Sequence, residues 1–531
     1  MVLNDFQRKV INILAKHSPV WLVGGAVRDR LLGTDSNDLD LVTFLNPERA
    51  DNILRASGLI SRQIGMRFKT LSLFEADSRI DLVCVDDLEG DARRRDFTIN
   101  AIYMNPLSEE IYDPLAGTMD LNNKRLRACG DAGERFREDP VRILRMVKFS
   151  VRFGLEIEKD TWKEARNNLG LLADAAKERV TSELAGILIL ADAEKAVRML
   201  MEMGYWDVFI PELARLEGIV QNQYHSLDVW EHTLAVFRNT PEDLFLRLAG
   251  LFHDIGKWET ASRECFLAGK LEFHDQEFWV QEYKIIGTRG KGELESKIKL
   301  LVGKNVKILG SRLDHYPQIV QFKRNLPGEK GTKGLTLVEN GKRHFLNHEK
   351  AGSKLLVEIL KRYCFSMVFT GSGQRREKDL LELIENHMQA TLAFMPEFNA
   401  RTSRRSFKER AAELVWKICW DGRNFKLQKI HDFVLLWKAD FQAGKVHNEA
   451  QNNIFEKIFN ELIRIALWQN ENLPCIDWNQ INSFVSAQGI KGEKIGKFKN
   501  YMRQKAMKEM NLEINPIFLK KAYAEIDISK R

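Results

Sequence analysis

The 531-residue sequence has few cysteines and no long apolar run. Its six cysteines are widely spaced and form no C-x-x-C pair, which argues against a disulfide framework and against a zinc site built from thiolates. The longest apolar run, at about residues 185–191, is much shorter than the roughly 20 residues of a membrane span. The first residues also lack the apolar core of a signal peptide. We therefore expect a cytoplasmic protein that does not contact a membrane.

Length and composition predict a globular protein of several domains. A chain of this length is expected to form about three or four domains, and 44% hydrophobic with 29% charged residues allows a sizeable core. The net charge of +7 is unevenly distributed. Residues 284–343 contain about 14 Lys and Arg against about 5 Asp and Glu, and residues 491–508 are also basic. Such segments are either solvated faces or surfaces that contact a phosphate backbone.

The stretch WLVGGAVRDRLLGTDSNDLDLVTF, residues 21–44, predicts a strand, a glycine turn, a helix, a loop and a second strand. Gly24 and Gly25 would let the backbone approach a phosphate group. The N-terminal amides of the following helix and the charge of Arg28 would then favour the phosphate.

Two carboxylates open the second predicted strand. Asp38 and Asp40 alternate with leucines, so both are expected on one face of the strand. Because they repel each other, a divalent cation between them is a natural solution, and oxygen ligands suit Mg²⁺. Asp81, on another predicted strand, is either a third carboxylate of this site or a salt-bridged aspartate. A lone D-x-D is usually a surface turn, and the nearby glycine turn favours the functional interpretation.

From about residue 126 the pattern predicts helices. The segment EDPVRILRMVKF predicts a helix with Asp139 as its N-cap and Pro140 at its first position. Arg142, Arg145 and Lys148 recur every three residues and would form a basic stripe along it.

A different cluster of polar residues begins near residue 220. An apolar helix ends in His253 and Asp254, and burying both without partners would be costly, so a metal or a hydrogen-bond network must satisfy them. Further ligands of the same kind are His232, His348, His387 and Asp440. A Lys/Gly-rich piece of poor periodicity, at about residues 259–340, reads as an insertion within this helical part.

Several motifs together resemble the family of class II CCA-adding tRNA nucleotidyltransferases and bacterial poly(A) polymerases. The matching motifs are LVGGAVRD, NDLDLVT, RRDFTINAI, DPLAGTMDL and EDPVRILR, in the family's order over about the first 215 residues. LFHDIGK and HFLNHEKAG resemble the HD domain that many of these enzymes carry. The resemblance implies a catalytic head (1–125), a helical nucleotide- and RNA-binding neck (126–218), an HD domain with a basic insertion (219–449) and a helical tRNA-facing tail (450–531).

The resemblance also implies roles for the head residues. Asp38 and Asp40 would hold two Mg²⁺ ions, and Asp81 would be the third carboxylate. The residues implied in nucleotide binding are Gly24, Gly25, Arg28, Arg94, Arg95, Asp96, Asn100, Asp139, Arg142, Arg145 and Lys148. Lys148 stands where the family usually has arginine, so a bidentate contact at that position is in doubt.

Asp139 and Arg142 suit the selection of bases. Cytosine and adenine each present an exocyclic amine beside a ring-nitrogen acceptor, whereas uracil and guanine present a carbonyl beside a ring N–H. A carboxylate that accepts from the amine and a guanidinium that donates to the ring nitrogen would therefore select C and A.

Following the HD pattern, His232, His253, Asp254 and Asp440 would bind a divalent transition metal. His348 and His387 would complete a two-metal site for phosphoester hydrolysis.

The sequence thus predicts an α+β protein, with a mixed-sheet head followed by predominantly helical parts. The expected activity is addition of C and A to the 3′ end of tRNA from CTP and ATP. Addition of only CC or only A remains open. Two rival functions are poly(A) synthesis and an RNA-binding HD phosphohydrolase whose transferase site is inactive.

Overall fold

The computed structural model describes the chain in two compact units, residues 1–209 and residues 210–531. The described residues are 3–34, 39–64, 70–75, 78–219, 227–260, 345, 347–365, 377–398, 406–420, 425–444, 448–472, 478–487 and 502, together with eight strands between residues 264 and 339. Within these ranges, no helix combines the length and the apolar character needed to cross a lipid bilayer.

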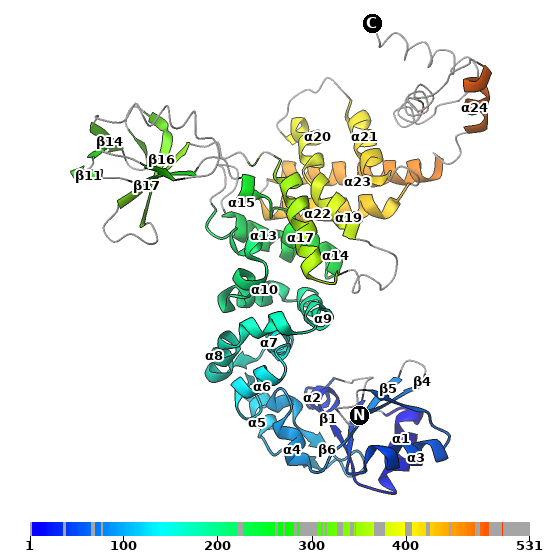
Figure 1. Ribbon diagram of the computed structural model, residues 1–531. Coiled ribbons are helices and arrows are strands. Elements are labelled where there is room, and N and C mark those ends of the chain that lie inside the picture. Colours follow the sequence, from blue (N-terminus) through cyan, green and yellow to red (C-terminus); the bar gives the residue numbers. More distant parts are fainter. Residues whose placement is uncertain are drawn as a thin grey trace. The chain divides into compact units, whose positions relative to one another are not determined.

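The first unit begins with a seven-stranded mixed sheet in the order β3-β4-β5-β2-β1-β6-β7 (Figure 1). The strands are β1 (Val20–Val23), β2 (Leu39–Thr43), β3 (Ser61–Ile64), β4 (Thr70–Glu75), β5 (Ser78–Cys84), β6 (Tyr103–Met104) and β7 (Ile111–Tyr112). β2 and β5 are parallel, and the other neighbouring pairs are antiparallel. β1 and β2 confirm the two strands predicted within residues 21–44, and β5 confirms the strand predicted around Asp81.

The two faces of this sheet differ in what they pack against. Leu22, Leu41 and Leu82 are fully buried and share a core with α1 (Asp5–Ala15) and α3 (Pro47–Ala56). Because side chains alternate along a strand, Asp40 projects to the opposite face, as does Val42. The candidate site therefore lies on the face away from the α1 and α3 core.

Short helices follow the sheet in the first unit. They are α2 (Gly25–Leu31), between β1 and β2, and then α4 (Leu88–Arg93), η1 (Thr98–Asn100), α5 (Gly117–Asn122), α6 (Ala132–Glu138), α7 (Arg142–Phe153), α8 (Lys159–Asn167), η2 (Leu169–Asp174), α9 (Lys177–Leu188), α10 (Ala193–Met203) and α11 (Tyr205–Phe209). Two short strands, β8 (Arg125–Leu126) and β9 (Glu156–Ile157), pair in parallel. Helices α6 to α11 agree with the helical pattern predicted from about residue 126.

The second unit is mainly helical and surrounds a set of buried histidines. Its helices are α12 (Pro211–Ala214), α13 (Val229–Asn239), α14 (Leu244–Phe252), α15 (Lys257–Thr260), α17 (His348–Arg362), α19 (Glu377–Asn386), α20 (Gln389–Phe398), α21 (Phe407–Cys419), α22 (Leu427–Ala443), α23 (Glu449–Asn472) and α24 (Trp478–Ala487). α13 packs on α14 and α22, and α19 packs on α14, α17 and α22 (Figure 1).

The segment between α15 and α17 was expected to be an insertion of poor periodicity within a helical part, and it contains a β-sheet instead. It contains eight strands, β10 (Glu264–Ala268), β11 (Leu271–His274), β12 (Glu277–Val280), β13 (Lys284–Ile286), β14 (Asn305–Leu309), β15 (Arg312–Leu313), β16 (Tyr316–Asn325) and β17 (Lys333–Glu339). They form an antiparallel sheet in the order β11-β12-β14-β15-β16-β17-β10-β13. β10 pairs with β17, nearly the whole insertion apart in sequence, so local periodicity could not reveal the sheet. The expected α+β class holds.

Candidate functional site

Two carboxylates lie side by side on the face of the head sheet that is opposite α1 and α3. Asp40 of β2 pairs in register with Asp81 of the parallel strand β5, so both side chains project to the same face. Asp81 accepts hydrogen bonds from Ser72 and from Arg79, whose guanidinium lies 2.8 Å from its Oδ2. Burial raises the pKa of Asp40; Arg95 opposes this shift and the negative charge of Asp81 adds to it. A cation held between the two carboxylates would relieve this repulsion.

The glycine turn before α2 is set directly against Asp40. Gly24 has a φ of +72°, and a Cβ at this position would come within 2.9 Å of Asp40 Oδ2. Glycine is therefore required both by the left-handed backbone and by the close carboxylate. Asp38 lies outside the described residues, and its place on the face of Asp40 remains a prediction.

The arginine string after α4 is organised by one buried carboxylate. Asp91 is 4% exposed and binds Arg94, Arg95 and the Tyr103 hydroxyl, with the Arg95 Nε at 2.9 Å. Arg94 is half exposed, whereas Arg95 is largely enclosed and close to Gly24. Burial lowers the pKa of Arg95, but Asp91 and its other partners more than offset this effect and leave it raised. Arg95 is thus a fixed positive charge beside the Asp40 carboxylate.

A chain of hydrogen bonds links α2 to α7. The Arg28 Nη1 donates to Asn100 Oδ1 at 2.6 Å, and the Asn100 amide donates to Asp96 at 3.0 Å. Asp96 then receives the Arg145 guanidinium at 2.6 Å. The guanidinium of Arg28 also lies over the ring of Phe153 on α7, at 4.3 Å. These contacts join four of the predicted nucleotide-binding residues in one network.

Electrostatics explains why Asp96 stays charged in this network. Burial alone would raise the pKa of Asp96. The positive charge of Arg145, with hydrogen bonds from the Asn100 side chain and the Phe97 amide, outweighs burial and lowers that pKa. Asp96 is therefore an anion that holds Arg145 against the head.

The start of the predicted base-selecting helix differs from the sequence expectation. α7 begins at Arg142 with Val141 as its N-cap, so the prediction that Asp139 caps the helix and Pro140 opens it is wrong. Asp139 instead follows the last residue of α6. Successive backbone hydrogen bonds between residues three apart form a tight turn there. One of them is donated by the Arg142 amide to the Asp139 carbonyl at 3.1 Å. Pro140 has no backbone N–H to donate, and this suits the turn as well as it suits a helix start.

Asp139 and Arg142 are held from outside α7. Arg179 of α9 lies 2.7 Å from Asp139 Oδ2, and the Asp139 Oδ1 accepts the Val141 amide at 3.3 Å. Arg142 donates to the backbone carbonyl of Arg94 at 2.8 Å and to Glu138 at 3.1 Å. Both side chains are therefore positioned by neighbouring elements.

The remaining cations of α7 share a carboxylate on α9. Lys148 Nζ lies 2.6 Å from Glu183 Oε2, and Arg145 Nη1 lies 4.0 Å from the other oxygen. Gly186, one turn along α9, faces the Lys148 side chain, because a Cβ there would lie 3.4 Å from Lys148 Cδ. The basic stripe is thus paired with a carboxylate, and Lys148 is packed against a second helix.

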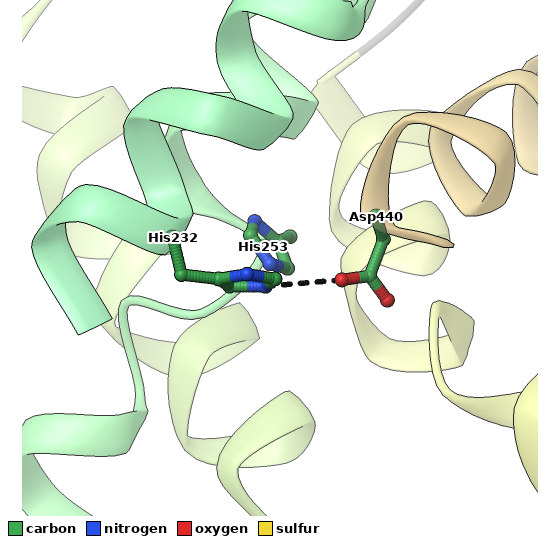
Figure 2. Close-up of side chains that lie close together, drawn as sticks. All are labelled: His232, His253 and Asp440. Atoms are coloured by element: carbon green, nitrogen blue, oxygen red, sulfur yellow. Dashed lines mark ion pairs between the residues drawn. The ribbon is translucent and has the colours of Figure 1, made fainter. Parts of the chain in front are cut away.

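The second candidate site gathers all six residues predicted for it. His232 comes from α13, His253 and Asp254 from the end of α14, His348 from the start of α17, His387 from the end of α19 and Asp440 from α22. Figure 2 shows three of these side chains facing one another. They form two groups, each with ligand atoms within 4.8 Å of one another: His232, His253 and Asp440; Asp254, His348 and His387. We call these six residues the histidine cluster.

Asp254 is the centre of the histidine cluster. Its Oδ2 lies 3.1 Å from His253 Nε2, and its Oδ1 lies 3.2 Å from His348 Nε2. His232 Nε2 lies 3.0 Å from Asp440 Oδ1 (Figure 2). Each group therefore combines imidazole nitrogens with a carboxylate, and Asp254 contacts members of both.

Backbone contacts fix the imidazole rings. The Nδ1 atoms of His253, His348 and His387 lie 2.9, 2.7 and 2.6 Å from backbone carbonyls. A neutral ring whose Nδ1–H donates to its carbonyl directs the lone pair of Nε2 inward, toward the other residues of the cluster. His348 Nε2 and His387 Nε2 are only 3.2 Å apart. Two facing lone pairs are unfavourable, and a shared divalent cation or proton would resolve them.

The donor set of the histidine cluster suits a transition metal. Burial, with the neighbouring His348 and His253, lowers the pKa of His387 to about 3, so this ring is a neutral ligand at physiological pH. The charges of His253 and Lys257 outweigh burial and hold the pKa of Asp254 well below its usual range. Mixed imidazole and carboxylate donors favour ions such as Zn²⁺, Mn²⁺ or Fe²⁺, whereas Asp40 and Asp81 offer only oxygen and favour Mg²⁺.

The structure also shows supporting residues that the sequence predictions missed. Lys257 Nζ lies 2.6 Å from Asp254 Oδ2, and its spacing of three residues on a helical segment could have indicated this contact. Glu183 and Arg179 had no such indication, because their partners lie about 35 to 40 residues away in sequence.

Known protein families and proteins are similar to parts of this chain. Residues 20–85 and 81–127 match the poly(A) polymerase head domain, and residues 154–216 match a probable RNA- and SrmB-binding site of polymerase A. The chain is 33% identical over 270 residues to the A-adding tRNA nucleotidyltransferase of Deinococcus radiodurans, covering 48% of this chain and 60% of that protein. It is 35% identical over 274 residues to the multifunctional CCA protein of Paracidovorax citrulli, covering 45% of this chain and 62% of that protein.

One solved structure supports the fold over nearly the whole length. The CCA-adding enzyme of Thermotoga maritima, complexed with tRNA, is 18% identical, with a TM-score of 0.53 over 99% of this chain and 96% of that one. The two sequence matches span under two thirds of those relatives. The match to the head domain covers the Asp40–Asp81 pair and Asp96. The chain is therefore similar, over about half of its length, to tRNA nucleotidyltransferases, and its residues 20–127 match the poly(A) polymerase head domain.

Proposed function

We propose that the protein adds C and A nucleotides to the 3′ end of tRNA without a nucleic-acid template. The observation that carries this proposal is the pairing of Asp40 with Asp81 on adjacent parallel strands, directly under the Gly24 turn. In the reaction the terminal 3′-oxygen attacks the α-phosphorus of CTP or ATP, the bond to the β-phosphate breaks and pyrophosphate leaves. The hydroxyl proton is lost to solvent or to a nearby base.

The head residues have distinct tasks in this proposal. Asp38, Asp40 and Asp81 would hold divalent cations, and Mg²⁺ there would lower the pKa of the 3′-hydroxyl and neutralise the triphosphate. The backbone at Gly24 and Gly25 would approach the phosphates. Arg95 lies beside Asp40 as a fixed positive charge, which suits a contact with the triphosphate.

The Arg28–Asn100–Asp96–Arg145 network would place α7 relative to the head. Asp139 and Arg142 would accept from the exocyclic amine and donate to the ring nitrogen of C or A. Because Arg179 pairs with Asp139, it would orient this carboxylate.

The proposal is tested by supplying the protein with RNAs whose 3′ ends are defined. tRNAs ending before CCA, after C and after CC, and an unstructured RNA, are incubated with CTP alone, ATP alone or both. Extension of each tRNA to a complete CCA end, with no extension of the unstructured RNA, is the expected result. Extension only up to CC, or only by the last A, would assign the partial activity. Long A tails on the unstructured RNA would instead establish poly(A) synthesis.

The histidine cluster supports a second, separable activity. Its two groups share Asp254 and hold imidazole and carboxylate donors at metal-binding distances, which suits hydrolysis of a phosphoester at a site with two divalent ions. We propose that this site is a metal-dependent phosphohydrolase of HD type.

A further inference from the structure

A pocket of about 530 Å³ lies in the second unit, at the ends of three helices. It is bounded by α19, by the end of α21 and by the start of α22. Pockets of this size take small organic ligands. The neighbouring pair Asp432–Phe433 lies two turns before Asp440 on α22, or roughly 10 Å along the helix axis. None of the six residues of the histidine cluster lines the pocket, although Asn386, which precedes His387, does.

The floor of the pocket is apolar and one wall is aromatic. Phe245, Leu383 and Phe433 line it and are almost fully buried. Trp420 also lines it, and its ring is stacked on that of Trp416, with centroids 4.7 Å apart and planes 11° apart. This stacking fixes the plane of the Trp420 ring, so a flat ligand ring would meet a rigid aromatic wall.

The charged groups of the pocket are of two kinds. Lys429 is enclosed and paired with Glu382 and with Asp379, at 3.3 Å from the latter. Lys417 is exposed and, within the part of the chain that the structure describes, pairs with no carboxylate. The buried carboxylate of Asp432 also lines the pocket and accepts from Gln428 at 2.9 Å. Lys417 is thus the lining cation that can contact an anionic ligand, and the Asp432 carboxylate is an acceptor in the pocket wall.

We propose that this pocket binds a single nucleotide unit. The base would stack on Trp420, its exocyclic amine would donate to Asp432 and its phosphate would contact Lys417. An apolar molecule would leave Asp432 and Lys417 unused, and a simple anion would leave the aromatic wall and the apolar floor unused. The same chemistry is presented by a free nucleoside monophosphate and by an unpaired nucleotide of an RNA strand.

Binding of AMP and CMP to the full-length protein tests the proposal. Titration calorimetry is performed in EDTA, with Asp40→Ala as a background that leaves this pocket unchanged and weakens nucleotide binding at the head. We expect one saturable site that survives in Asp40→Ala. Trp420→Ala should weaken binding by roughly tenfold or more, because a base stacked on an aromatic ring loses its partner. Lys417→Ala should weaken it several-fold and reduce its salt dependence.

The matched control is Lys408→Ala, which removes an exposed lysine from the same helix and should bind like the wild type. If Trp420→Ala does not fold, Trp420→Leu and Lys417→Glu give the same comparison. A tRNA-binding assay then separates the two sources. A free nucleotide as the ligand predicts unchanged tRNA affinity in Trp420→Ala, whereas an RNA nucleotide predicts weaker tRNA binding and competition by AMP. The proposal is wrong if neither AMP nor CMP binds and no pocket variant changes tRNA affinity.

Discussion

The two candidate metal sites differ in their donors and in how the chain brings those donors together. At the head, Asp40 and Asp81 are carboxylates on neighbouring strands, partly open on one face of the sheet. In the second unit, the histidine cluster collects side chains from five helices, and five of its six residues are at most 6% exposed. An open oxygen site suits cations that accompany an entering triphosphate, whereas a closed nitrogen and oxygen site suits resident ions.

The sites also differ in how their side chains are held. Gly24 and Arg95 surround Asp40 at the head, so that site is shaped by backbone approach and by positive charge. In the histidine cluster, backbone carbonyls orient three imidazole rings, which leaves their Nε2 atoms facing inward. The geometry of the head therefore suits a phosphate, and the geometry of the cluster suits a bound metal.

The largest expected effect separates the two sites. Asp40→Ala should reduce nucleotide incorporation on the order of a thousandfold, because a lost metal ligand removes several kcal/mol of transition-state stabilisation. The metal content of the histidine cluster, measured by elemental analysis after dialysis, should not change. Glu48→Ala, which removes an exposed carboxylate from α3 of the same unit, is the matched control. Full activity in a folded Asp40→Ala protein would refute the head site.

The converse change tests the histidine cluster. His253→Ala should weaken retention of a divalent transition metal by roughly a hundredfold and abolish metal-dependent phosphodiester hydrolysis, because a direct ligand is lost. Incorporation of CTP and ATP into tRNA should remain. His431→Ala, which removes an exposed histidine from α22, is the control. Loss of incorporation in a well-folded His253→Ala protein would mean that the two sites depend on each other.

The same contrast explains what could be predicted from the sequence. The head site follows from local pattern: the glycine turn and the alternation around Asp40 predict strand, turn, helix and strand, and the structure has them. For Asp81 the sequence leaves two interpretations open, a third carboxylate of this site or a salt-bridged aspartate, because its in-register pairing with Asp40 depends on which strands become neighbours. The histidine cluster was named from the HD resemblance, because its ligands are spread from residue 232 to residue 440 and local pattern cannot relate them.

Failures of prediction have a similar cause. Asp139 and Pro140 are residues that favour both a helix start and a tight turn. Because α6 ends at Glu138, directly before them, they form the turn and α7 begins only at Arg142. The sheet of the insertion depends on pairing between strands far apart in sequence, such as β10 with β17. Long-range contacts decided both outcomes.

The smallest expected effect concerns the choice of base, which the head carboxylates should not control. Asp139→Ala and Arg142→Ala should relax discrimination against UTP and GTP by roughly tenfold to a hundredfold, because each removes a hydrogen bond worth about 1–3 kcal/mol of base selection. Competition between nucleotides in a single-addition assay measures this ratio.

Arg179 provides the finer test. It pairs with Asp139 from α9, so Arg179→Ala should relax discrimination less than Asp139→Ala does, while Lys177→Ala on the same helix leaves it unchanged. A role of Asp139 in base selection requires that the loss of discrimination is largest in Asp139→Ala, smaller in Arg179→Ala and absent in Lys177→Ala. If Asp139→Ala and Arg142→Ala leave the ratio of C and A to U and G incorporation unchanged, base selection resides elsewhere. Asp40→Ala serves as the control, because it should lower the rate for every nucleotide alike and leave this ratio unchanged.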